Sequence, residues 1–290
     1  MAEKKKTSFD ELTPKMQELV REELRRQERR RKTIIIVLVM IMVLAFGGYA
    51  VYYMTAGKTQ DGYDTLARLK GSKALSNMKE GEGVVTATFS DGQEITLEIL
   101  DEYKTLYNKS KKKLIGWLKI DDTIIDYPVM QGSDNEFFLS HDLEGNEDRA
   151  GALFLDCACD VVHGSDNYII YGHHLTSGRM FSSLEEYESE KYYEKHPYIN
   201  FDTIYEKGRY QVMYAFRSRV YDSDEIVFKY YQFINAESGE EFDYNMEQMA
   251  ALAFYDTGVK AQWGDRLLTL STCDYQETNG RFVVVAKKIG

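Results

Sequence analysis

The longest apolar segment of the chain is an uncharged run of 21 residues, Ile34 to Met54. As an α-helix that rises about 1.5 Å per residue, this run would extend ~32 Å, which is enough to cross a bilayer. Four basic residues, Arg29 to Lys32, lie just before it, and an excess of cationic residues marks the cytoplasmic side of a span. The pattern therefore predicts a single-pass membrane anchor over residues 34–54, with residues 1–33 cytoplasmic and the long C-terminal part extracellular.

A cleaved signal peptide is the alternative interpretation of the same segment. The apolar run is longer than a typical signal-peptide core, and Met54-Thr55-Ala56 lacks a small residue at its first position, so retention of the anchor is the better hypothesis. Upstream, Pro14 suits the first turn of a charged helix that runs into the span, with a possible capping box from Ser8 to Glu11.

Residues 55–101 are predicted to form an extracellular stalk. Glycines at positions 57, 62 and 71 interrupt a weak helical pattern, so only one short helix is expected, near residues 63–69. Alternating apolar and polar residues then follow at 84–89 and 94–99, on either side of Asp91-Gly92. This arrangement predicts a β-hairpin within the stalk.

From Leu114 onward the apolar residues form short β-like runs, separated by turns rich in Gly, Asn and Asp. Such regular spacing favours a closed β-barrel. Helical patterns interrupt the runs at 181–187 and at 240–254. The runs cover residues 114–120, 124–130, 151–156, 167–171, 209–216, 266–272 and 281–286.

The second helical pattern carries an apolar stripe, made of Phe242, Met246, Met249 and Ala250. These residues recur at helical spacing, and core packing explains such a stripe better than a ligand site. We therefore expect these four residues to be core residues.

Composition and charge narrow the class of protein further. With 43% hydrophobic and 29% charged residues in 290, the chain is globular in character, with one or two domains plus appendages. Residues 1–32 carry eleven Lys or Arg against seven Asp or Glu, so most of the acidic excess behind the net charge of −11 lies after the anchor. A strongly acidic outer part argues against nucleic acid as a partner, because phosphate recognition needs a basic surface.

Candidate chemistry lies near the C-terminus, where Leu270-Ser271-Thr272-Cys273 closes an apolar run. The chain has only three cysteines, and Arg281 follows this one after eight positions, on the next apolar run. A thiol needs a base, and the run from Tyr168 to Tyr171 ends similarly on Gly172-His173-His174. If these runs are neighbouring strands, Cys273, His173 and Arg281 would meet at one rim as nucleophile, acid/base and oxyanion or substrate donor.

Ordinary pKa values define the energetic problem of such a site. A thiol titrates near ~8.5 and an imidazole near ~6.5, so the neutral pair is favoured over the ion pair by ~100 to 1, or ~2.7 kcal/mol. A guanidinium stabilises a thiolate but repels an imidazolium. We therefore expect Arg281 to act mainly on charge that develops on the acyl oxygen.

These motifs together resemble the sortase family, and its class B in particular. The resemblance covers residues 102–290 and also includes Gly116–Ile120, Asp126–Gly132 and Asp134–Leu139. It implies a mainly β catalytic domain, a closed sortase-type barrel of about eight strands with peripheral helices. It also implies a cysteine transpeptidase that cleaves the C-terminal sorting signal of a secreted protein and holds the product as a thioester. The protein would then pass to an amino group of a peptidoglycan precursor or a pilin.

The resemblance also distributes roles among the residues. The catalytic histidine of sortases directly follows the glycine, which selects His173 over His174. Residues near the substrate groove are implied to be Asn135, Leu139, Tyr171, Ser271 and Thr272, and Asp274 is expected to shape the active-site loop. For the groove residues a structural role is an equally good interpretation: Leu139 in the core, Asn135 in a turn, and Ser271 and Thr272 simply in a strand.

Cys157 and Cys159 end another β-like run, where a disulfide between alternate strand positions would be strained. A metal pair with His141 or His163 is conceivable, but two thiols do not make the four-ligand spacing of a structural zinc site. We therefore expect free thiols, no metal and no cofactor.

Two other functions fit parts of the pattern. A papain-like peptidoglycan peptidase also uses a cysteine, but such enzymes place it at a helix start and before the histidine, whereas here His173 precedes Cys273. An anchored receptor or adhesin would use the barrel only for binding. Acylation of the thiol would exclude that second alternative.

Overall fold

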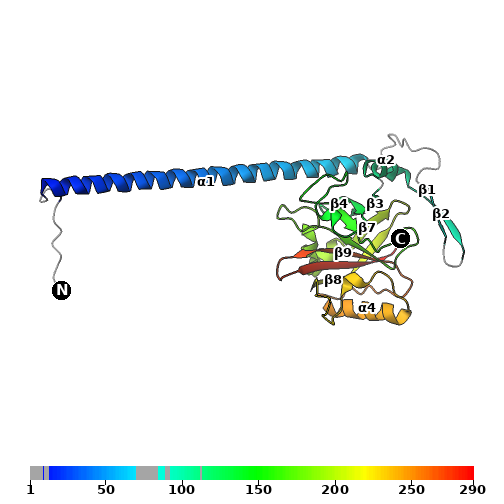
Figure 1. Cartoon of the computed structure of the whole chain (residues 1–290). Coiled ribbons are helices and arrows are strands. Elements are labelled where there is room, and N and C mark those ends of the chain that lie inside the picture. The colour runs from blue at the N-terminus through cyan, green and yellow to red at the C-terminus, as the bar shows by residue number, and fades with distance from the viewer. Residues whose placement is uncertain (1–8, 10–12, 70–83, 89–91, 112) are drawn as a thin grey trace, which may run out of the picture. The chain divides into compact units, whose positions relative to one another are not determined.

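The structure is a computed structural model that describes residues 9, 13–69, 84–88, 92–111 and 113–290. By internal contacts the chain divides into two units, Met1–Lys58 and Thr59–Gly290, and each is described by itself (Figure 1). The predicted capping box from Ser8 to Glu11 and the glycine at position 71 lie outside the described residues.

The first unit contains most of the long helix α1, which begins at Pro14 and ends at Leu69. Its residues Pro14–Val51 are long and apolar enough to cross a membrane, and the apolar side chains are exposed, with Ile34 at 59% and Leu44 at 75%. A helix whose apolar side chains are exposed all around it suits a non-aqueous environment. The helix is therefore a candidate membrane anchor.

The helix also corrects one expectation about the stalk. Gly57 and Gly62 were expected to interrupt the helical pattern, but α1 continues through both of them to Leu69. A single glycine costs a helix only about 1 kcal/mol relative to alanine, which a long helix tolerates.

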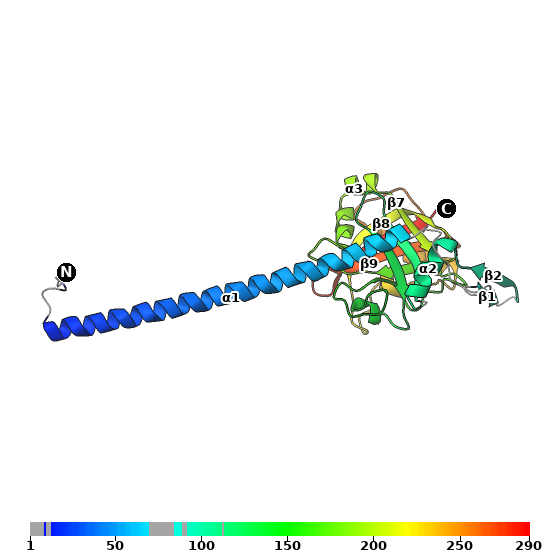
Figure 2. The same ribbon diagram turned by 90° about the horizontal axis from the view of Figure 1, so that it is seen from above.

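The predicted hairpin is confirmed as β1 (Val84–Thr88) paired antiparallel with β2 (Glu94–Glu98). Gly92 has a φ of 84°, the left-handed conformation that a tight turn needs. Helix α2 (Asp101–Lys109) follows and buries Tyr103 and Leu106. Figure 2 shows α2 and the hairpin on the outside of the barrel.

Eight strands form a closed barrel in the order β10-β8-β7-β3-β4-β5-β6-β9, which confirms the predicted fold. The pairs β4–β5 and β6–β9 are parallel, and the other pairs are antiparallel. The strands are β3 (Leu114–Lys119), β4 (Asp126–Gln131), β5 (Leu153–Leu155), β6 (Asn167–Tyr171), β7 (Tyr198–Thr203), β8 (Arg209–Arg219), β9 (Leu267–Asp274) and β10 (Gly280–Lys288).

The strand that sequence analysis missed is β7. Ile199 and Phe201 point into the core while their neighbours are exposed or half-buried, so the alternation extends over only six residues. It directly follows a charged segment that forms the short helix α3 (Glu190–Lys195), which hides the pattern. The expected helix at 181–187 is present as the 3₁₀ helix η3 (Ser182–Glu188).

Helix α4 (Gly239–Leu252) covers β8 on the outside of the barrel (Figure 1). Ser238 caps it by accepting a hydrogen bond from the Glu241 N–H at 3.2 Å. As predicted, Phe242, Met246 and Met249 are core residues, packed in a cluster with residues of β8, β9 and β10. Ala250 is exposed, so the predicted stripe is one residue too wide.

Candidate active site

Cys273 lies near the end of β9, directly opposite Arg281 of β10. The antiparallel register pairs these two residues, with Thr272 opposite Phe282 and Asp274 opposite Gly280. Residues opposite each other in an antiparallel pair project from the same face of the sheet. The sulfur and the guanidinium therefore lie on one face although eight positions separate them in the chain.

His173 reaches the same place because β6 runs parallel to β9. Tyr171 pairs with Ser271, and the ladder continues as the Gly172 N–H donates to the Ser271 carbonyl at 3.1 Å. The Thr272 hydroxyl then donates to the Gly172 carbonyl at 2.8 Å. β6 ends at Tyr171, and one position beyond Gly172 and Thr272 come His173 and Cys273, which line the same cavity.

All three residues line one cavity of about 210 Å³. The five residues expected near the groove line it as well, together with Gly172 of the histidine motif and four residues that sequence reasoning did not select, Phe154, Val220, Tyr230 and Tyr231. The expected groove residues are Asn135, Leu139, Tyr171, Ser271 and Thr272. The cavity therefore brings together a thiol, an imidazole and a guanidinium with aromatic and polar walls.

A main-chain carbonyl fixes the orientation of the His173 ring. Nε2 of His173 lies 2.7 Å from the carbonyl oxygen of Leu139, at the end of the 3₁₀ helix η2 (Phe137–Leu139). Because a carbonyl only accepts, Nε2 carries the hydrogen, and in the neutral ring Nδ1 is the nitrogen free to take up a proton. The same contact stabilises the ring when it is cationic.

Arg281 is anchored by one of its terminal nitrogens. Nη1 donates to the carbonyl of Gly280, the first residue of β10, at 2.8 Å and to that of Asn279, in the turn before β10, at 3.3 Å. A guanidinium has five N–H donors in a rigid plane. Holding Nη1 orients this plane and leaves the remaining donors for a ligand in the cavity.

One wall of the cavity is built around Asp156, a residue that the sequence analysis did not single out. Its buried carboxylate accepts hydrogen bonds from Nδ2 of Asn135 at 2.8 Å and from the hydroxyl of Tyr171 at 2.9 Å. Burial, together with the charge of Asp156, raises the pKa of Tyr171, so that phenol remains a donor. Oδ1 of Asn135 accepts from the Cys157 N–H at 2.8 Å, which fixes this amide at both ends.

Ser271 and Thr272, the two residues before the nucleophile, both form side-chain hydrogen bonds in the cavity wall. The hydroxyls of Ser271 and Tyr230 lie 2.8 Å apart, and both residues are buried. Burial raises the pKa of Tyr230 to about 12. Leu139, at 41% exposure, stands at the rim and is not the core residue that the alternative interpretation required.

Asp274 shapes the turn after the nucleophile. Its buried carboxylate accepts from Nε of Arg217 at 2.6 Å and from the Gln276 N–H at 2.9 Å. Arg217 also binds both carboxylate oxygens of Glu188, at 2.7 and 2.8 Å, and these bonds raise the pKa of Arg217. The turn is thus tied to β8 and to η3.

The other two cysteines have environments that disfavour the thiolate. Cys159 is buried, which raises its pKa to about 12, and burial together with the charge of Asp156 also raises the pKa of Cys157. Both are free thiols, Cys157 exposed and Cys159 buried. A raised pKa lowers the fraction of nucleophilic thiolate at neutral pH.

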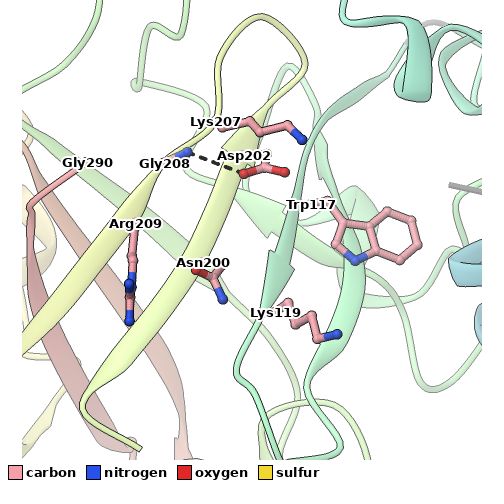
Figure 3. A pocket seen from close by; sticks show the side chains of 8 residues that line it. All are labelled: Trp117, Lys119, Asn200, Asp202, Lys207, Gly208, Arg209 and Gly290. Atoms are coloured by element: carbon pink, nitrogen blue, oxygen red, sulfur yellow. Dashed lines mark hydrogen bonds between the residues drawn. The ribbon is translucent and has the colours of Figure 1, made fainter. Parts of the chain in front are cut away.

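A second cavity, of about 330 Å³, lies on the wall formed by β3, β7 and β8 (Figure 3). Its lining includes Lys119 and Lys207, which are paired with Asp126 at 3.7 Å and Glu102 at 3.2 Å. Asp202 accepts from the Gly208 N–H at 3.3 Å, as the dashed line shows. No thiol or imidazole is among the described residues that line this cavity, so the candidate chemistry lies in the first one.

Comparison with known proteins identifies the relatives of the chain. Residues 118–289 match the sortase domain family. The chain is 34% identical to sortase B of Staphylococcus aureus over 183 residues, which cover 62% of the chain and 72% of that protein. It is 32% identical to sortase B of Listeria monocytogenes over 196 residues, 66% of the chain and 76% of that protein.

Solved structures give the same result. A Staphylococcus aureus sortase B–substrate complex superposes with a TM-score of 0.65 and 28% identity, covering 81% of the chain and 98% of that structure. Sortase B from Bacillus anthracis, in complex with AAEK1, superposes with a TM-score of 0.65 and 25% identity, covering 82% and 99%.

Proposed function

The chain belongs to the sortase family of cysteine transpeptidases and resembles its class B members, and on this premise we propose that it attaches secreted proteins to an amino group. Cys273 attacks the scissile carbonyl of a C-terminal sorting signal, and the acyl part of the substrate remains on the sulfur as a thioester. The acceptor is the amino group of a peptidoglycan precursor or a pilin. The observation that carries this proposal is the convergence of Cys273, His173 and Arg281 on one cavity.

Each step assigns a proton and a charge. Nδ1 of His173 takes the thiol proton of Cys273, the sulfur forms the new bond to the carbonyl carbon, and Arg281 stabilises the negative charge on the carbonyl oxygen. Protonated His173 delivers its proton to the leaving amine as the peptide bond breaks. The neutral ring then takes a proton from the incoming amine, which displaces the sulfur and restores the thiol site.

Solved structures of relatives support an amino group as the acceptor and a peptide as the substrate. A sortase B structure has been solved in complex with triglycine, and that of Staphylococcus aureus with a substrate. Triglycine presents a free amino group on a short flexible peptide. In this chain the cavity wall of Asn135, Leu139 and Tyr171 would contact the sorting signal, beside Ser271 and Thr272.

The proposed topology places the catalytic domain, residues 102–290, outside the cell. Residues 34–54 anchor it in the membrane, residues 55–101 form the spacer, and residues 1–33 remain in the cytoplasm. The basic cluster from Arg29 to Lys32 supports this orientation. Protease treatment of intact cells should degrade the catalytic domain and spare an N-terminal tag; degradation of the tag instead would reverse the topology.

Mass spectrometry tests the chemistry directly. Wild-type protein incubated with a library of sorting peptides should gain the mass of the acyl fragment on the peptide that contains Cys273, and an added amine should release it. Cys273→Ala should neither gain this mass nor cleave the peptide. Undiminished cleavage by Cys273→Ala would refute the assignment, and an inert thiol in the wild type would favour a receptor or adhesin.

A further inference from the structure

His174, the neighbour of the proposed acid/base, contacts the main chain of the nucleophile. Its Nδ1 lies 3.2 Å from the carbonyl oxygen of Cys273 and 3.1 Å from Oε1 of Glu185. Both partners accept hydrogen bonds, so Nδ1 carries a hydrogen that the two acceptors share. Its side chain is 17% exposed, and that of Glu185 is 33% exposed. One imidazole therefore joins the loop after β6, the 3₁₀ helix η3 and the end of β9.

A second hydrogen bond links the loop after β6 to the segment that follows Cys273, and here the side chain comes from the second segment. The hydroxyl of Tyr275 donates to the carbonyl of His174 at 2.7 Å, and the rings of the two residues are 5.1 Å apart. The loop that carries the histidines is fixed at its other end as well, because the Phe181 N–H donates to the His173 carbonyl at 3.0 Å. Each of the two segments thus binds a main-chain carbonyl of the other: His174 binds that of Cys273, and Tyr275 binds that of His174.

We propose that His174 is a positioning residue that holds the main chain of Cys273 at a fixed distance from the loop bearing His173, with Glu185 orienting its imidazole. The inference rests on the proposed function, since it concerns the geometry of the same site. His173 and His174 are adjacent, so a bond from His174 to Cys273 restricts how far the reactive ring and the sulfur can move apart. Small displacements of reacting groups cause large losses in rate, which makes such a restraint valuable.

Two substitutions separate this role from simple packing. In His174→Asn the side-chain amide keeps an N–H donor at nearly the position of Nδ1, whereas His174→Leu fills the space without a donor. We expect His174→Leu to lower the kcat of acylation about tenfold, the effect of one hydrogen bond, with little change in KM. His174→Asn should recover most of the loss, and Glu185→Gln should lie between them.

His196→Leu is the matched control. Nδ1 of His196 also binds a main-chain carbonyl, that of Asp121 at 3.0 Å, but His196 does not line the cavity. This variant should acylate as the wild type does. If His174→Leu fails to fold, as judged by thermal unfolding, Glu185→Gln and His174→Asn carry the comparison with the wild type.

A second readout does not require a sorting peptide. Alkylation by iodoacetamide at pH 7, measured on the peptide that contains Cys273, should slow in the same order of variants, because the sulfur loses its fixed place beside His173. If the wild type acylates and His174→Leu and Glu185→Gln match it, or if His174→Asn is as slow as His174→Leu, the positioning role is wrong. If alkylation follows the expected order while no peptide acylates the wild type, the proposed function fails and the positioning role stands.

Discussion

Replacing Arg281 by lysine keeps the positive charge of the site but removes the planar set of N–H donors. In the structure, Nη1 of Arg281 is occupied by the carbonyls of Gly280 and Asn279, at 2.8 and 3.3 Å, and the other nitrogens of the plane remain for the substrate. A lysine amine is a single nitrogen on a flexible stem. In Arg281→Lys one atom would have to serve both the turn and the acyl oxygen.

The expected loss is that of one donor to a developing oxyanion. Removal of such a donor lowers turnover ~10² to 10³-fold, which corresponds to ~2.7 to 4 kcal/mol of transition-state stabilisation. Single-turnover formation of the Cys273 thioester, followed by mass spectrometry, measures this step alone. Because Arg281 acts mainly on the acyl oxygen, alkylation of Cys273 by iodoacetamide should change much less than acylation.

Arg209→Lys provides the control for this experiment. Arg209 lies on β8 with its guanidinium 4.0 Å from the ring centroid of Tyr198, and it lines the second cavity on the barrel wall. The same chemical change there should leave acylation unaffected. An Arg281→Lys enzyme that acylates within about threefold of the wild type would refute a role for the guanidinium plane in stabilising the transition state.

Three further predictions concern the framework of the site. Burial raises the pKa of the Cys159 thiol to about 12, from 9.0 in the unfolded chain. The folded state therefore holds this proton more tightly, and the stability that this gives is complete below pH 9.0 and is lost as pH rises toward 12. Cys159→Ala should flatten the dependence of the unfolding free energy on pH in that range, and an unchanged slope would contradict this. Asp156→Ala should lower the unfolding free energy by about 2 kcal/mol and raise the KM for sorting peptides, because it removes the acceptor from the half-buried donors of Asn135 and Tyr171; unchanged urea unfolding and KM would show that the wall does not need this carboxylate. Phe242→Ala should cost about 3 to 5 kcal/mol in urea unfolding, whereas the same change at the exposed Tyr244 of α4 should cost less than about 0.5 kcal/mol, and equal costs would refute the packing of this helix.

Cys273, His173 and Arg281 could be selected from the sequence because the first two stand where apolar runs end and Arg281 stands where the next run begins. Cys273 and His173 both follow β-like segments, and these segments are neighbouring parallel strands in the barrel. The pairing of Arg281 with Cys273 follows from a tight turn between consecutive strands, which is a local feature. Strand ends and short turns can therefore be predicted from the sequence alone.

The supports of the site could not be predicted in this way. Asp156 meets Asn135 and Tyr171 only because β5 pairs with β6 and the loop before η2 folds over them. Likewise, the contact between His174 and Glu185 joins the loop after β6 to the 3₁₀ helix η3, and nothing in either segment specifies the other. Such interactions depend on the tertiary arrangement, which hydrophobic periodicity does not encode.

The central claim is that sulfur, imidazole and guanidinium act on one acyl group, and a crystal structure of the Cys273 thioester with a sorting-peptide analogue tests it most directly. We predict that the acyl oxygen accepts a hydrogen bond from Arg281 at about 2.7 to 3.1 Å and that Nδ1 of His173 faces the position of the leaving amine. An acyl oxygen turned away from Arg281, or an acyl group attached outside the cavity of His173, would contradict the account.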